Sequence, residues 1–261
     1  MKHGLEGRAF AKAIAILVAF VAAGGGAVAA QTIDPNAAMR AADLTMYPAS
    51  FSMIASISTL HRGADATTME IEVEHKAGRG TFMEMLSPPR SKGMRFLQTE
   101  GALWMYSPRS GSRSPIRLSP RESFQGSVFS NNDVGDSTWA NDYTASLAGS
   151  TTIDSPDFGK VDVWIVAGTA KRWDVPYGSV RLYLRKDGLL PLRVEYDAKS
   201  GLHIKTMELS GYSSIAGRLR PSRLVMTATD GTGDSSTVVI RDLKAREDLP
   251  DAMFNQSWLV R

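Results

Sequence analysis

Few residues of this sequence are spaced for metal or acid–base chemistry. Beyond the first thirty residues the histidines stand alone, at His61, His75 and His203. None of them has the H-x-x-x-H or H-E-x-x-H spacing that places two zinc ligands on one helix face. A zinc-dependent site is therefore not indicated.

Two other clusters could hold a metal ion. His75 follows carboxylates that alternate along one strand face at Glu70, Glu72 and Glu74. We interpret these residues as a solvated face, because charged residues at period two usually face water. Asn131–Asp133 and Asp136 offer oxygen ligands but lack the closing bidentate Glu of a calcium loop. A cap or turn is the better interpretation, and we expect neither a metal nor a cofactor.

Covalent catalysis is not indicated either. The chain has no cysteine, which excludes thiol nucleophiles and Cys-ligated zinc. It has no G-x-S-x-G nucleophile elbow and no G-x-x-x-x-G-K phosphate loop. Ser, Asp and His are present, but no spacing nominates a catalytic set. We therefore predict that the protein is not an enzyme.

The positive signal is methionine and aromatic content on predicted strands. Methionine is flexible and polarizable and suits surfaces that adapt to loosely shaped apolar ligands. A curved sheet lined in this way could enclose an acyl chain; composition alone favours the alternative, an ordinary packed core. The predicted lipid-binding cavity consists of Met53, Met69, Ile71, Met83, Met85, Met94, Phe96, Trp104, Tyr106, Val128, Phe129, Trp164, Met207 and Met226.

The elements that would position these side chains are mainly strands. A short helix is expected over 34–46, with Asp34 as a candidate N-cap and Pro35 in the first turn. Alternation at period two then predicts strands in 51–58, 67–74, 81–86, 94–99, 102–106, 114–118, 161–169, 179–185, 192–197, 203–212, 223–229 and 237–243. Ten or more strands with turn signals between them predict an antiparallel meander. Such a sheet protects its edges by closing or curling into a barrel or half-barrel.

Two segments break this rhythm. The polar segment 121–138 predicts a long excursion with a short helical turn, and 250–258 a terminal helix. Few contacts would allow 121–138 to open and close as a lid.

The N-terminus is typical of a secretory signal peptide. A stretch with more basic than acidic residues precedes the apolar run of residues 13–23, and small residues end the segment at Ala27–Ala30. Cleavage is expected near Ala29–Gln31, which leaves residues 31–261 as a single domain. The apolar run is shorter than the roughly 20 residues that a membrane-spanning helix needs. The alternative, an uncleaved anchor, is less favoured. A formal charge of +3 gives little support to nucleic-acid binding.

Three motifs resemble those of the LolA-like family of outer-membrane lipoprotein-sorting proteins. They are the strand Leu103–Arg109 (LWMYSPR), the segment Ser123–Asp133 (SFQGSVFSNND) and the strand Leu190–Asp197 (LPLRVEYD). The similarity runs from about residue 67 to residue 243. It implies a half-open antiparallel β-barrel with short helices as a lid over an apolar cavity.

The resemblance also implies a function, that of a periplasmic carrier. Such a carrier binds lipid or lipoprotein acyl chains and shuttles them toward the outer membrane. The donor would be an inner-membrane transporter and the acceptor an outer-membrane component. The alternative is a periplasmic sensor or adaptor of the same fold that regulates a membrane-protein partner. A hydrolase on this fold is a third and weaker alternative.

Overall fold

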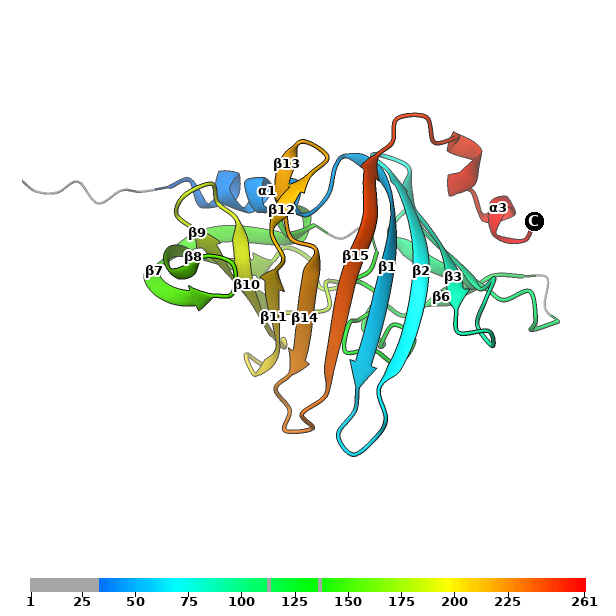
Figure 1. Cartoon of the computed structure of the whole chain (residues 1–261), viewed down its shortest axis with the longest axis horizontal. Helices are drawn as coiled ribbons and strands as arrows, with labels where there is room; N and C mark the ends of the chain where they lie inside the picture. The colour runs from blue at the N-terminus through cyan, green and yellow to red at the C-terminus, as the bar shows by residue number, and fades with distance from the viewer. Residues whose placement is uncertain (1–32, 112–113, 136–137) are drawn as a thin grey trace, which may run out of the picture. The chain divides into compact units, whose positions relative to one another are not determined.

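A computed structural model describes residues 33–111, 114–135 and 138–261, and the predicted signal peptide lies outside the described residues. Thirteen of the described strands form one sheet in which all neighbours are antiparallel (Figure 1). One wing of the sheet comprises β1 (Ser50–Leu60), β2 (Thr67–Lys76), β3 (Gly80–Ser87), β4 (Arg95–Thr99), β5 (Ala102–Tyr106) and β6 (Ile116–Leu118). The other wing comprises β7 (Tyr143–Ser155), β8 (Gly159–Ala170), β9 (Ser179–Arg185), β10 (Pro191–Asp197), β11 (His203–Ser210), β14 (Arg223–Ala228) and β15 (Ser235–Ala245).

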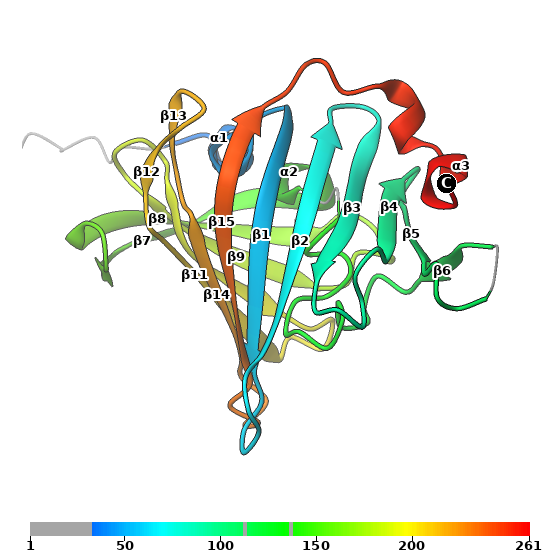
Figure 2. The same cartoon turned by 45° about the vertical axis from the view of Figure 1, so that its right-hand side comes forward.

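The two wings meet at the centre of the sheet, where β1 pairs with both β2 and β15. The edge strands are β6 and β7. The sheet curls so that β7–β9 pass behind β15, β1 and β2 (Figure 2). One cluster of buried side chains from both wings lies on the concave side. The predicted fold class, a curved antiparallel sheet left open as an incomplete barrel with few short helices, is confirmed.

Period-two burial gives the sheet an apolar inner face. Along β1, Phe51, Met53, Ala55 and Ile57 are buried, and the residues between them are partly exposed. Each inner side chain is opposite another from a neighbouring strand, as Ala55 is opposite Ile71 of β2. The predicted orientation of this strand is correct.

The outer face of β3–β5 is covered by the C-terminal segment. That segment contains η1 (Asp251–Phe254) and α3 (Gln256–Leu259), in place of the single terminal helix that was expected. Its Leu249, Phe254 and Leu259 are buried against Phe82 and Leu97 of the sheet. The strand β3 is therefore buried on both faces, with Met83 and Met85 inward and Phe82 outward.

The helix α1 (Pro35–Met46) covers part of the concave side. The Asp34 side chain caps it by accepting a hydrogen bond from the Asn36 backbone N–H at 2.9 Å, as expected. The buried residues of α1 include Ala38, Met39 and Ala42, and the helix contacts β7, β8 and β9. Gly168 of β8 makes this contact close, because a Cβ there would lie 3.1 Å from the Met39 Cε.

The connection between β6 and β7, residues 119–142, runs from one edge of the sheet to the other. It ends in α2 (Trp139–Asp142), and within it Ser123 and Ser130 form an isolated β-bridge. Phe124 is fully buried, with its ring centroid 5.1 Å from that of Phe96. The segment 121–138 is therefore anchored by buried aromatic residues, whereas the sequence predicts a lid with few contacts.

Two elements of the structure are not predicted from the sequence, the strand β7 and the hairpin of β12 and β13. The long edge strand β7 has small and polar residues at most positions and is largely exposed, so it lacks a clear apolar face. The hairpin of β12 (Ser213–Ile215) and β13 (Arg218–Arg220) is short and forms a separate two-stranded sheet. Both lie where apolar alternation, the signal used for strands, is weak.

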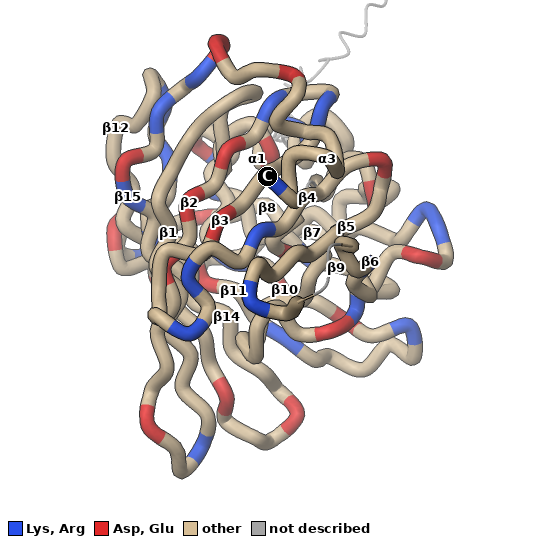
Figure 3. The backbone as a smooth tube through the Cα atoms, turned by 90° about the vertical axis from the view of Figure 1, so that its right-hand side faces the viewer, with Lys and Arg blue, Asp and Glu red and all other residues tan. Residues whose placement is uncertain are grey.

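The surface distribution of charge is mixed. On the side that carries β2–β5 and α3, Lys and Arg are interspersed with Asp and Glu (Figure 3). No helix within the described residues is long and apolar enough to span a bilayer.

Candidate functional site

A cavity of about 440 Å³ lies on the concave side of the sheet. Its walls come from β1, β2, β3, β11, β14 and β15, and residues of α1, α2, β7, β10, the β8–β9 loop and the 119–142 connection also line it. Most of the inner lining is apolar and consists of Met46, Phe51, Met53, Ala55, Ile57, Ile71, Val73, Met83, Phe129, Met207, Leu224, Met226 and Val238. Such a lining has no group that could form directed polar contacts with a ligand.

The structure brings several of the predicted cavity residues together around this space. They come from both wings and from the connection between them: Met53, Ile71, Met83, Phe129, Met207 and Met226. Their flexible thioethers can change rotamer to fit apolar ligands of different shape. The facing methionines Met207 and Met226 are cross-strand partners on β11 and β14.

Other predicted residues lie near the cavity but do not line it. Met69 and Met85 are buried and border a separate hollow of about 90 Å³ beside the 88–91 turn. Phe96 is fully buried in the same core, and Met94 and Val128 pack against that core.

The remaining predicted residues lie elsewhere. Trp104 and Tyr106 pack on the outer face of β5, against the cluster formed with the C-terminal segment. Trp164 is buried in β8, and the Lys186 Nζ lies 4.5 Å from its ring centroid. These aromatic residues stabilise the sheet from positions outside the cavity lining.

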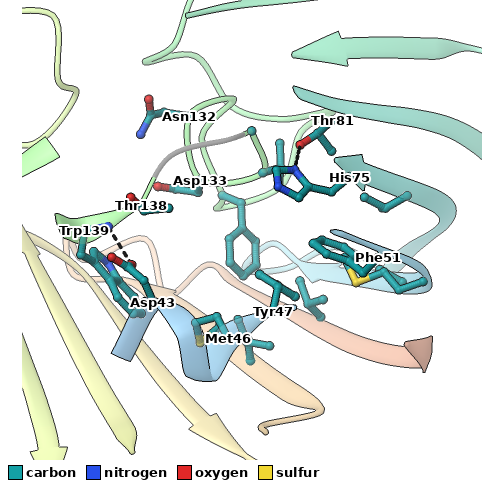
Figure 4. Close-up of a pocket in the computed structure, with 18 of the residues that line it drawn as sticks. Asp43, Met46, Tyr47, Phe51, His75, Thr81, Asn132, Asp133, Thr138 and Trp139 are labelled. Atoms are coloured by element: carbon teal, nitrogen blue, oxygen red, sulfur yellow. Dashed lines mark hydrogen bonds between the residues drawn. The ribbon is translucent and has the colours of Figure 1, made fainter. Parts of the chain in front are cut away.

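An aromatic column forms one wall of the cavity. The Tyr47 and Phe51 rings stack at 5.0 Å between centroids, and Phe51 stacks on His75 at 5.2 Å. The His75 Nδ1 is 2.9 Å from the Thr81 Oγ1 (Figure 4). Burial raises the pKa of Tyr47 to about 12, so its hydroxyl is protonated at neutral pH. The Tyr47 and Phe51 rings of this wall are therefore uncharged at neutral pH.

Asp43 links the two helices that border the cavity. Its Oδ1 accepts from the Trp139 backbone N–H and its Oδ2 from the Ala140 backbone N–H, each at 2.9 Å. In Figure 4 this carboxylate of α1 points at the start of α2. Burial raises the pKa of Asp43 to about 6, although the two backbone hydrogen bonds oppose that rise. The link between α1 and α2 therefore contains a group that titrates just below neutral pH.

A second polar group lies on the opposite side. The Tyr177 hydroxyl donates to the Asp133 Oδ2 at 2.7 Å and accepts from the Lys205 Nζ at 3.1 Å. The same Asp133 oxygen accepts from the Ser130 backbone N–H at 2.7 Å. Burial lowers the pKa of the Lys205 ammonium, an effect that Asp133 partly offsets. These bonds fix the 119–142 connection to β11 and the β8–β9 loop.

Sequence reasoning missed most of the cavity's polar and aromatic rim. The missed residues are Asp43, Tyr47, His75, Trp139, Tyr143, Tyr177 and Tyr196. Most of them lie at element ends, in loops or on the edge strand β7, where no periodic pattern marks them. Phe51 was recoverable, because it shares the inward orientation of Met53.

The site does not present a catalytic arrangement within the described residues. His75 bonds Thr81, whereas the other two histidines bond carboxylates elsewhere: His61 with Asp234 and His203 with Asp197. No group of three or more His, Asp or Glu side chains is placed to hold a metal in the part of the chain that the structure describes. What the cavity can do is shield an apolar group from water.

Comparison with known proteins places the chain among similar folds. A family model described as an uncharacterized protein matches residues 77–261. A LolA superfamily protein from Nitrosomonas europaea is 25% identical, with a TM-score of 0.77, over 87% of this chain and 100% of that one. A search of curated proteins found no match.

Two further solved structures share the fold at lower identity. One, from Vibrio parahaemolyticus, is described as a domain of an outer membrane lipoprotein-sorting protein. It is 20% identical, with a TM-score of 0.72, and the match covers 87% of this chain and 98% of that one. The other is a DUF1329 family protein from Desulfovibrio piger. It is 20% identical, with a TM-score of 0.74 and coverage of 86% and 97%.

Proposed function

Because this chain belongs to the family whose model matches residues 77–261 and is a LolA-like protein of the outer-membrane lipoprotein-sorting type, we propose that it is a periplasmic carrier of acyl chains. In this proposal it binds lipid or lipoprotein acyl chains in the concave cavity and carries them toward the outer membrane. A lipoprotein-sorting or lipoprotein-binding role is the function that the fold supports at the family level. The observation that carries the finer proposal is the methionine-rich cavity of about 440 Å³.

The physical chemistry of the cavity fits an acyl ligand. Burying one methylene gains about 0.8 kcal/mol, so even a partly enclosed chain is held well. The inner lining offers no fixed polar group that would select one ligand shape. Its methionines can repack around chains of different length or branching.

The proposed route begins with export and ends at another membrane. The predicted signal peptide over residues 1–30 would direct the chain to the periplasm and be removed near Ala29–Gln31. An inner-membrane transporter would load the cavity, and an outer-membrane acceptor would empty it. The water-filled gap between the membranes is the reason that a shielding cavity is needed.

The test uses a pair of substitutions on neighbouring residues of β1. Ala55 lines the cavity and is buried, whereas Ser56 on the same strand faces outward and is partly exposed. Ala55→Phe places a ring in the space that an acyl chain would occupy. Ser56→Phe adds the same ring on the other face and is the matched control.

The measurement is native mass spectrometry of the mature protein purified from the periplasm of its host. We expect wild type and Ser56→Phe to carry additional masses that fragment as acyl-bearing lipids, and Ala55→Phe to lose them. Circular dichroism checks that both variants are folded. A wild-type protein without any lipid mass, or equal loading in both variants, would contradict the proposal. An empty cavity would favour the sensor or adaptor role.

A further inference from the structure

Two large hydrophobic side chains are unusually exposed on one part of the surface. The exposed fraction is 83% for Trp173 and 67% for Leu202. Trp173 lies in the β8–β9 loop and Leu202 in the β10–β11 turn. The Lys199 Nζ donates to the Trp173 backbone oxygen and so joins the two loops. They also approach closely at Gly178, where a Cβ would lie 2.8 Å from the Lys199 Cα.

Basic side chains surround the exposed tryptophan. The Arg121 Nη2 donates to the Trp173 backbone oxygen at 3.3 Å, and the Lys171 Nζ donates to the Ala140 backbone oxygen at 2.6 Å. Arg121, Lys171 and Lys199 are all exposed. The acceptors of these bonds are uncharged backbone oxygens and do not neutralise the three cations.

The neighbouring Arg172 differs from these three cations. It pairs with Asp142 and with Asp174 at 3.1 Å each, so these three side chains together have a net charge of −1 and offset one of the three cations. We define the Trp173 patch as Trp173, Leu202, Arg121, Lys171 and Lys199. It combines exposed apolar area with an excess of positive charge.

The loop that carries Trp173 also contributes to the lining of the cavity. In the same loop, Val175 and Tyr177 are buried, and Tyr177 lines the cavity. The Lys171 backbone N–H donates to the Asp142 backbone oxygen at 2.8 Å, which fixes the loop to α2. The α2 residues Trp139 and Asn141 also line the cavity. A surface that engages Trp173 therefore lies close to two elements that line the cavity.

We propose that the Trp173 patch docks on the surface of a bilayer that contains anionic lipids. Tryptophan prefers the headgroup region, where its ring is half apolar and its N–H can bond to water or lipid. Lysine and arginine near such a surface are attracted to the negative headgroups. This inference rests on the proposed carrier function, because docking would present the cavity mouth to the membrane that supplies or receives the acyl chain.

The experiment measures sedimentation of the mature protein with two kinds of vesicle. One contains phosphatidylcholine alone, and the other contains phosphatidylcholine and phosphatidylglycerol. We expect binding to the anionic vesicles that falls as salt is added. Trp173→Ala and Lys199→Glu should each weaken it by about tenfold. Leu60→Ala, which removes a half-exposed apolar side chain from the β1–β2 hairpin, is the matched control and should bind as wild type does.

Several outcomes would overturn the proposal. They are no binding to anionic vesicles, equal binding to both kinds of vesicle, and equal losses in Trp173→Ala and Leu60→Ala. Absence of vesicle binding would point to a protein partner at this patch. Native mass spectrometry separates this inference from the carrier function: Trp173→Ala keeps its bound lipid if only docking is affected, whereas Ala55→Phe loses it.

Discussion

Asp43 is the residue whose removal tests the energetics of the cavity rim most directly. Its carboxylate accepts two backbone hydrogen bonds from the start of α2 and is shielded from water. The substitution Asp43→Asn preserves the shape of the side chain, but the amide that replaces the carboxyl group cannot ionise. One of the two N–H groups loses its acceptor, which adds a cost that does not depend on pH.

The magnitude follows from the pKa. Burial raises the pKa of Asp43 from 3.8 to about 6, and one pKa unit corresponds to about 1.4 kcal/mol. Because the folded pKa is the higher one, folded protein holds a proton between these values that unfolded protein has lost. The stability from this proton is complete below the unfolded pKa and is lost as pH rises through the folded pKa. The loss amounts to about 3 kcal/mol.

The assay compares free energies of unfolding in urea for wild type and Asp43→Asn over a series of pH values. Subtracting the two removes the contribution of titrating groups that do not interact with Asp43; Asp142, which raises the pKa of Asp43, is the exception. We expect the stability of the variant relative to wild type to rise by about 3 kcal/mol between about pH 3.5 and about pH 7. A difference that stays constant over this range would refute the reasoning. So would a carboxyl ¹³C titration of folded wild type that places the pKa of Asp43 near 3.8.

Three further predictions concern positions outside the cavity rim. Gly80→Ala should destabilise the protein by about 3 kcal/mol or more in urea unfolding, because a Cβ there would lie 2.0 Å from the Gln98 backbone oxygen; a loss below about 1 kcal/mol would contradict this. The pKa of His61 is raised by its hydrogen bond to Asp234, so Asp234→Asn should lower it in an NMR titration, and an unchanged midpoint would count against the bond. In wild type, the bond between His61 in the β1–β2 hairpin and Asp234 in the β14–β15 hairpin is strongest while His61 is protonated. It weakens as pH rises through the raised pKa of His61. Phe124→Ala should cost about 3–5 kcal/mol and speed hydrogen exchange in residues 121–138; unchanged exchange would mean that the ring does not anchor the segment.

The sequence predicts the parts of the fold that follow apolar alternation. In β1, Met53, Ala55 and Ile57 alternate with serines at 52, 56 and 58, and the structure has the same orientation. The edge strand β7 could not be recognised in this way. Its stability comes from pairing with β8 along its length, and hydrogen bonding leaves no residue pattern in the sequence.

The candidate site is predictable only where burial is local. Met53 can be assigned to an inner face by its alternation with serines, but the inward side of 81–86 is undecided from the sequence, because Phe82 and Leu86 alternate with Met83 and Met85. Trp104 and Tyr106 could not be assigned in this way. They pack against the C-terminal segment that covers β5, and this contact joins residues that are far apart in the sequence. Asp43 is a comparable case, because its partner helix α2 is remote in sequence.

The position of β1 at the centre of the sheet has a consequence for how the chain acquires its structure. Phe51 pairs with Ala245 of β15, the last of the described strands, so one side of β1 stays unpaired until that strand is available. Contacts between such distant residues form slowly, and an unpaired strand edge is prone to wrong pairing in the meantime. A chain that emerges N-terminus first therefore completes its two wings separately and joins them late. If the chain is exported as proposed, the two wings can join only after β15 has emerged from the membrane.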